Sequence, residues 1–279
     1  MRAAPRAWHF VATAAVLAVL LAASYLFFVQ GYMGQLIDEQ ARTGAQFAVV
    51  AEASTLLDAV PLLSAGVVLI AVVIGAIRRQ RVATVLALIV VAAANLTSQL
   101  LKHEVLTRPD NGATGAWHNS FPSGHTTVIV SAVFALFLVS APRLRPVIAA
   151  VGSLAIVAVG SLLVGSQWHR PSDVVAGVLV VAIYVFLGGA VLARVRPVAP
   201  SDRRAGVAGT VALLVLAAVA ATAALTLAYL TADASTEGTA AATAAGFVAI
   251  ASTTGGTAVL ASRLFRRCLL YTSDAADEE

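Results

Sequence analysis

Residues 122–141 read PSGHTTVIVSAVFALFLVSA, a polar tetrapeptide followed at once by an apolar run. Similar apolar runs recur along the chain, and a membrane-spanning helix needs about 20 such residues. Hydrophobic residues make up 59% of the 279 residues and charged residues 11%, whereas a soluble domain carries about 25% charge. We therefore predict an all-α integral membrane protein with about eight transmembrane helices. The eight apolar runs are residues 8–29, 58–77, 82–101, 124–141, 146–166, 173–193, 205–230 and 241–262.

Two segments outside these runs carry separate expectations. Residues 44–57 are moderately apolar and are predicted to form an interfacial helix before the second run. Residues 268–279 begin with Cys268, the only cysteine, so no intrachain disulfide can form. This segment reads like a translated sequencing adapter, and we predict that it is a non-native tail. The Arg, Ala and Val bias of the remaining chain is typical of a bacterial genome rich in G and C.

Arginines gather in every second loop between the apolar runs. The positive-inside rule predicts that these loops and both termini are cytoplasmic. The loops at 102–122 and 169–172 then lie on the opposite face of a cell membrane, which is the extracytoplasmic face. The net charge of +4 reflects this topology rather than a nucleic-acid partner. The arginines of the cytoplasmic set are Arg2, Arg6, Arg78, Arg79, Arg81, Arg143, Arg145, Arg194, Arg196, Arg203, Arg204, Arg263, Arg266 and Arg267.

Ser123, in the tetrapeptide that precedes the fourth run, is a favourable helix N-cap. Free amide groups and the positive end of the helix dipole at such a start attract an anion. His125 in the first turn is placed to donate a proton to a leaving oxygen. The alternative is an ordinary helix cap beside a chance histidine.

His169 and Asp173 are four residues apart at the start of the sixth run. An aspartate one turn from a histidine can hold one ring nitrogen as a donor and leave the other as nucleophile or base. Pro171 and Ser172 suit the first turn and cap of a helix. The alternative is an interfacial histidine next to a capping aspartate.

Lys102, the only lysine, and Arg108 follow the third run. Arginine makes fork-like contacts with phosphate oxygens, and lysine acts as a point charge. Snorkelling of two cations at the membrane interface is the alternative. Asn95 and Gln99 continue a polar stripe from Lys102 at helical spacing, and helix–helix hydrogen bonding explains both.

Together these residues resemble the type-2 phosphatidic acid phosphatase superfamily, the membrane relatives of vanadium haloperoxidases. That family has Lys, six residues and Arg-Pro as its first motif, Pro-Ser-Gly-His as its second, and Ser-Arg, then His and an Asp four later, as its third. Residues 122–125 match the second motif in full, and His169 and Asp173 match half of the third. The resemblance covers about residues 60–195. It implies a six-helix core within 1–195 and leaves two additional transmembrane helices in 196–267.

The resemblance also implies a role for each site residue. His169 would attack phosphorus and form a phosphohistidine, Asp173 would orient His169, and His125 would protonate the leaving group. Neither a metal ion nor another cofactor would be needed. The phosphate oxygens would be held by Lys102, Arg108, Ser123 and Gly124.

Two departures from the family pattern stand in the sequence. Five residues rather than six separate Lys102 from Arg108. Leu162 and Leu163 occupy the positions of the third motif's Ser-Arg, so the second phosphate-binding arginine is missing. Arg170, beside His169, is our candidate replacement, with lipid-headgroup contact and weakened catalysis as the alternatives.

The resemblance and the residues favour a membrane phosphatase acting on a lipid phosphate or diphosphate, such as undecaprenyl diphosphate, phosphatidate or phosphatidylglycerophosphate. Transfer of a phosphoryl or lipid-linked group is a variant of this chemistry. A protein that only binds or transports anionic lipids is an alternative of another class. A zinc hydrolase is a third reading. Its ligands would come from His103, His118, His125, His169, Asp110 and Asp173.

Overall fold

The computed structural model describes residues 7–46, 51–113, 119–195, 207–233, 235 and 237–265. The described residues form α-helices and two π-helical segments and contain no β-strand, which confirms the predicted all-α class. The α-helices are α1 (Ala7–Ser24), α2 (Tyr32–Gly44), α3 (Ala51–Ile77), α4 (Arg81–Leu100), α5 (Gly124–Val139), α6 (Arg145–Gly165), α7 (Pro171–Val195), α8 (Val207–Thr231) and α9 (Ala240–Phe265). The π-helical segments Tyr25–Gln30 and Leu101–Val105 extend α1 and α4.

Each of the eight apolar runs coincides with one helix. Seven of these helices are long and apolar enough to cross a membrane. The eighth, α5, has 16 residues and rises about 24 Å, less than the roughly 30 Å hydrocarbon core. Leu62, Leu154 and Leu230 are 78%, 72% and 74% exposed, as lipid-facing side chains are. The chain is therefore a multi-pass membrane protein.

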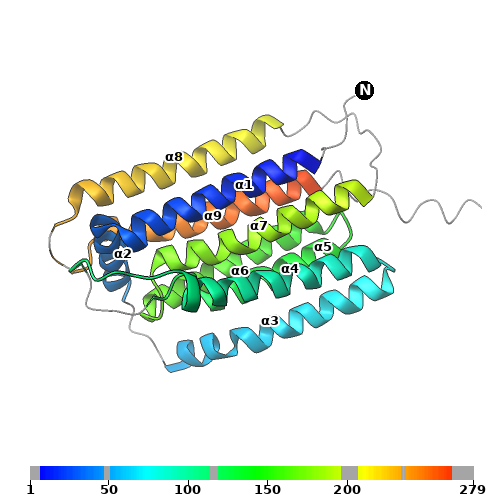
Figure 1. The fold of residues 1–279 in the computed structure, drawn as a ribbon, viewed down its shortest axis with the longest axis horizontal. Coiled ribbons are helices and arrows are strands. Elements are labelled where there is room, and N and C mark those ends of the chain that lie inside the picture. The colour runs from blue at the N-terminus through cyan, green and yellow to red at the C-terminus, as the bar shows by residue number, and fades with distance from the viewer. Residues whose placement is uncertain are drawn as a thin grey trace, which may run out of the picture.

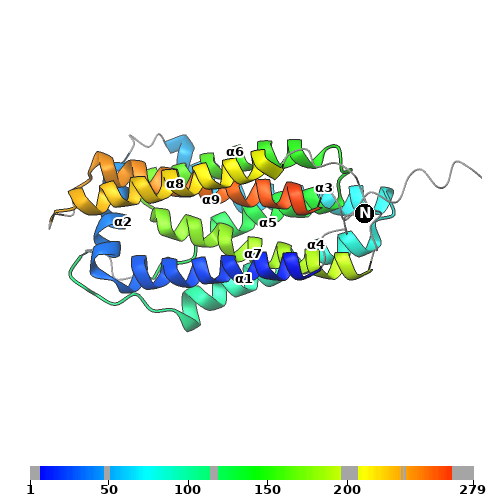
Figure 2. The ribbon, with the colours of Figure 1, turned by 90° about the horizontal axis from the view of Figure 1, so that it is seen from above.

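Helix α7 is the centre of the bundle. The long helices run side by side along one axis (Figure 1), and α7 lies between α1 and α9 in the perpendicular view (Figure 2). Phe10 of α1 and Phe265 of α9 meet edge to face with ring centroids 5.1 Å apart. A Cβ atom on Gly189 of α7 would lie 2.4 Å from Phe10 and 2.7 Å from Phe265, so the glycine permits this approach. The aromatic contact fixes the helix whose first turn carries Asp173.

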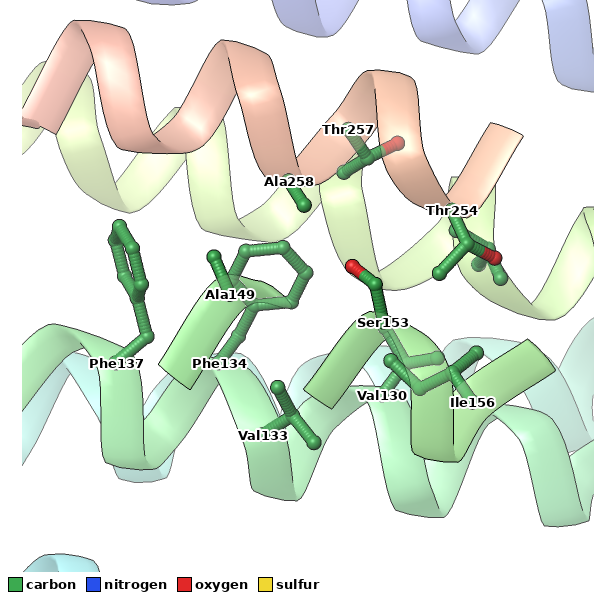
Figure 3. A pocket seen from close by; sticks show the side chains of 11 residues that line it. Val130, Val133, Phe134, Phe137, Ala149, Ser153, Ile156, Thr254, Thr257 and Ala258 are labelled. Atoms are coloured by element: carbon green, nitrogen blue, oxygen red, sulfur yellow. The ribbon is translucent and has the colours of Figure 1, made fainter. Parts of the chain in front are cut away.

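Helix α9 packs on α6, α7 and α2, and α8 packs mainly on α9. Figure 3 shows where α5, α6 and α9 meet, around a crevice of about 10 Å³. Ser153 of α6 and Thr254 and Thr257 of α9 bring hydroxyl groups to an otherwise apolar lining. Small residues of this kind allow membrane helices to approach closely. The last helix is thus packed directly against the motif-bearing helices.

Helix α2 lies across the end of the bundle at which α4 ends and α7 begins (Figures 1 and 2). The prediction of an interfacial helix at 44–57 was wrong, because α2 ends at Gly44 and residues 51–57 belong to α3. The polar segment that precedes Gly44 lies outside the apolar runs, yet its residues 34–41 are buried. Gln35 illustrates the reason, since its side chain donates to the carbonyl oxygens of Val29 and Pro109 at 2.7 and 2.9 Å. Partners of this kind allow a polar segment to fold as a buried helix.

Candidate functional site

Asp173 and His169 lie in contact, as their spacing predicts. Asp173 is fully buried in the first turn of α7, and its Oδ2 is 3.3 Å from Nδ1 of His169. The same oxygen accepts hydrogen bonds from the Ser120 hydroxyl at 2.6 Å and from the Arg170 amide at 3.0 Å. These contacts fix the carboxylate, and the carboxylate in turn orients the imidazole.

Three polar clusters, residues 102–109, 122–125 and 169–173, converge on Asp173. Nη2 of Arg108, from the first cluster, is 3.5 Å from Asp173 Oδ1. The amide of Ser123, from the second cluster, donates to the Asp173 carbonyl oxygen at 2.9 Å. Residues far apart in sequence therefore share one anchor at the start of α7.

The Pro-Ser-Gly-His segment forms the beginning of α5. Ser123 is the N-cap, and its Oγ accepts a hydrogen bond from the Thr126 amide at 3.3 Å. The His125 ring lies 6.3 Å from the His169 ring between centroids and meets Trp168 edge to face at 5.5 Å. The two imidazoles are therefore neighbours, and imidazole is the side chain most often used for proton transfer.

A cleft of about 560 Å³ opens beside His169, and Lys102 and His169 are among the side chains that line it. Asn119 donates to the carbonyl oxygens of Lys102 and Leu106 at 3.0 and 2.9 Å, which holds the cleft wall together. The lining residues are Lys102, His103, Asn119, Ser120, Trp168 and His169. Asn119, Ser120 and Trp168 belong to none of the motifs, so their only signal in the sequence is their position next to those motifs.

Arg108 carries donors without partners. Its side chain is 1% exposed, and Nε and Nη1 have no hydrogen-bond partner among the described residues. Buried guanidinium groups normally have their donors satisfied. A phosphate oxygen would complete this set.

Leu163 stands where the family has its third-motif arginine, and it is fully buried. Its carbonyl oxygen accepts hydrogen bonds from the amides of Trp168 and His169 at 3.0 and 3.2 Å. The backbone at this position therefore supports the histidine, and no guanidinium comes from it. The candidate replacement Arg170 is buried, with Nη1 3.5 Å from Ser120 Oγ.

Two acids of α2, Asp38 and Glu39, contact the third cluster and were missed by the sequence analysis. Asp38 accepts hydrogen bonds from the amide and hydroxyl of Ser172 at 3.0 and 2.5 Å. Glu39 Oε2 lies 2.9 Å from Nη2 of Arg170. Their signal in the sequence is an Asp-Glu pair one short segment after the first apolar run.

Burial and the negative charge of Asp173 raise the pKa of Asp38 to about 6, against the weaker opposing influence of Arg108, Ser172 and Arg170. Burial alone would raise the pKa of Glu39 as well. Its hydrogen bonds and ion pairs with Arg42 and Arg170 outweigh burial, so the pKa of Glu39 is lowered. The two neighbouring acids therefore differ in charge near pH 6.

The pKa of Asp38 predicts a pH-dependent stability. A carboxyl whose pKa is higher in the folded state stabilises the fold most at low pH, and this contribution is lost as pH rises through about 6. Asp38→Asn should therefore flatten the stability profile between pH 4 and pH 7 relative to wild type. Thermal unfolding in detergent across this range measures the difference. Parallel profiles for the two proteins would contradict the assignment.

The remaining histidine and aspartate candidates for zinc are dispersed. His103 and Asp110 are exposed, and His118 lies outside the described residues. Among the described residues, no three His, Cys, Asp or Glu side chains group closely enough to hold a metal ion. The zinc reading gains no support from this arrangement.

The polar stripe on α4 bonds to a neighbouring helix, as expected. Asn95 Nδ2 donates to Ser131 Oγ of α5 at 3.1 Å. Gln99 faces the start of α5, because a Cβ atom added to Gly124 would lie 3.2 Å from Gln99 Nε2. These contacts hold α4, which ends next to Lys102, against the helix that begins at Gly124.

Comparison with known proteins gives one family. Residues 83–196, from α4 to the end of α7, match the family model described as the PAP2 superfamily. No curated protein and no solved structure matches the chain significantly. The matched segment contains all three polar clusters, and members of this family are phosphatases, which supports a phosphoester hydrolase. Residues 83–196 therefore match the PAP2 superfamily, and this match supports the resemblance of the motifs to the type-2 phosphatidic acid phosphatase superfamily.

Proposed function

We propose that the protein is an integral membrane phosphatase that hydrolyses a lipid phosphate or diphosphate through a phosphohistidine. The observation that carries this proposal is the contact of His169 Nδ1 with the buried Asp173 carboxylate at 3.3 Å, beside the second imidazole of His125. Nδ1 faces the carboxylate, so Nε2 is the nitrogen left for phosphorus. The family match supports the same reaction class.

The reaction runs in two displacements. Nε2 of His169 attacks the terminal phosphorus, the P–O bond to the lipid (in a diphosphate, to the lipid monophosphate) breaks, and His125 protonates the departing oxygen. Water then attacks the phosphohistidine while His125 takes its proton. The P–N bond breaks and orthophosphate leaves. Asp173 stabilises the charge that develops on His169 in both steps.

Positive charge and helix amides hold the phosphate in this proposal. Lys102 lines the cleft, and Arg108 has two buried donors without partners. Gly124 begins α5 and offers its amide where the helix dipole favours an anion, and the Ser123 hydroxyl can donate its hydrogen. The Ser123 amide itself is bonded to the Asp173 carbonyl oxygen. Arg170, whose Nη1 lies 3.5 Å from Ser120 Oγ, is the proposed second phosphate-binding arginine. Such charge neutralisation is the main requirement of phosphoryl transfer.

Phosphate release from a panel of purified lipid phosphates and diphosphates tests the proposal. The expected result is release that exceeds the His169→Ala background and survives thorough chelation. Loss of release on chelation would overturn the metal-independent mechanism. Binding of the same lipids without any release would favour the lipid-binding alternative.

We further propose that the site faces the extracytoplasmic side of the cell membrane, with both termini cytoplasmic. The arginine-rich loops support this orientation. A reporter fused after Gln80 should behave as cytoplasmic and one after Gly112 as external. The opposite pattern would reverse the placement of the site.

A further inference from the structure

Glu39 grips one edge of the Arg170 guanidinium. Its Oε2 accepts from Nε of Arg170 at 3.0 Å and lies 2.9 Å from Nη2. The third nitrogen, Nη1, is 3.5 Å from Ser120 Oγ. Ser120 lines the cleft. The Glu39 carboxylate therefore contacts Nε and Nη2 of Arg170, and Nη1 is left next to Ser120 in the cleft wall.

These contacts form a continuous chain from α2 to the catalytic pair. Ser120 donates its hydroxyl hydrogen to Asp173 Oδ2 at 2.6 Å, and the same oxygen faces His169 Nδ1. The order is Glu39, Arg170, Ser120, Asp173, His169. The hydrogen bond from Arg170 Nε to Glu39 Oε2 is charge-assisted, and such bonds are stronger than those between neutral groups. A displaced Arg170 would therefore disturb both the cleft wall and the residues that orient the histidine.

The carboxylate is itself held in place. Glu39 also pairs with Arg42, one turn along α2, and both Glu39 and Arg170 are at most 5% exposed. Gln167, just before the third cluster, donates to the Arg42 carbonyl oxygen at 2.5 Å. Buried ion pairs gain little stability over apolar packing but are costly to break on one side. Their value here lies in the fixed position of Arg170.

We propose that Glu39 is a positioning residue of the phosphatase site, acting through Arg170 on phosphate binding. This inference rests on the proposed function and deepens it. It makes α2, which lies outside the family-matched residues 83–196, a working part of the site. It also explains how an arginine next to the histidine serves where the family's own third-motif arginine is replaced by Leu163.

A double-mutant cycle on inorganic phosphate binding tests the proposal. Dissociation constants are measured in detergent for wild type, Glu39→Gln, Arg170→Gln and the double variant, together with kcat and KM on the best lipid phosphate. Residues that orient metal ligands are typically worth about 10- to 100-fold in metal affinity, and we take the low end of this range for a carboxylate that orients a phosphate-binding arginine. We expect Glu39→Gln to weaken phosphate binding by about 10-fold in the wild-type background and not to weaken it further in Arg170→Gln.

Glu237→Gln is the matched control, because Glu237 is exposed in the segment between α8 and α9. Arg170→Lys gives a second route if Glu39→Gln does not fold. Lysine keeps the charge but lacks the fork, so a similar loss of affinity is expected. Wild-type affinity in Arg170→Lys or Glu39→Gln would overturn the proposal, as would an equal effect of Glu39→Gln in both Arg170 backgrounds.

The cycle separates the inference from the function on which it rests. Coupled phosphate binding without hydrolysis of any lipid phosphate would refute the phosphatase and retain an anion site organised by Glu39. Hydrolysis without coupling would refute the role of Glu39 alone. Wild-type protein that neither binds phosphate nor releases it would overturn both.

Discussion

Alanine in place of His169 is expected to reduce phosphate release by about 10³-fold or more, because the variant has no nucleophile for phosphorus. The loss should appear in kcat. The phosphate-binding groups Lys102 and Arg108 remain in the variant, so KM should change far less. Initial rates with purified protein on a saturating lipid phosphate measure both parameters.

The only described polar partner of the His169 side chain is Asp173, which keeps its hydrogen bonds from Ser120 and the Arg170 amide in the variant, so we expect the fold to remain intact. Thermal unfolding in detergent checks this point. His9→Ala is the matched control, since His9 lies on α1 outside the site. Release by His169→Ala at the wild-type rate would rule out the phosphohistidine.

The transmembrane helices followed from the sequence because lipid contact demands long apolar runs. On the outward face of α8, where Leu216 is 65% and Leu230 74% exposed, apolar side chains are all that contact with lipid requires. Run boundaries differed from helix ends by a few residues, as for α7, which begins at Pro171 rather than at 173. Caps and loops decide these ends, and composition does not.

Helix α2 was beyond reach of the same reasoning. Its polar side chains become acceptable inside the protein only through partners more than 70 residues away, such as Pro109 for Gln35 and Arg170 for Glu39. The spacing of apolar residues along the chain does not predict such contacts between distant residues. The site residues within motifs were accessible because chemistry restricts their spacing, as in His169 and Asp173. Ser120 and Glu39 stand at no fixed spacing from the motif residues, so the sequence did not mark them.

Asp173→Asn is expected to lower kcat by about 10²- to 10⁴-fold. An asparagine that presents its amide to His169 Nδ1 favours the wrong tautomer. Nε2 would then carry the proton and lose its nucleophilic lone pair. Ser120→Ala removes one donor to Asp173 Oδ2 and keeps the charge, so its loss should be much smaller. Phosphate release by the two variants, measured side by side, tests this order.

The same Asp173→Asn substitution should also destabilise the fold. It removes the only described ion-pair partner of Arg108, whose side chain is 1% exposed. An unpaired buried charge costs about 3 kcal/mol or more. Asp233→Asn is the control, because Asp233 is exposed and its acceptor oxygen is preserved by the change. A lower melting temperature with wild-type kcat would make Asp173 a structural anchor only. A normal melting temperature would mean that Arg108 finds another anion, such as bound phosphate, so the melts should be repeated without phosphate in the buffer.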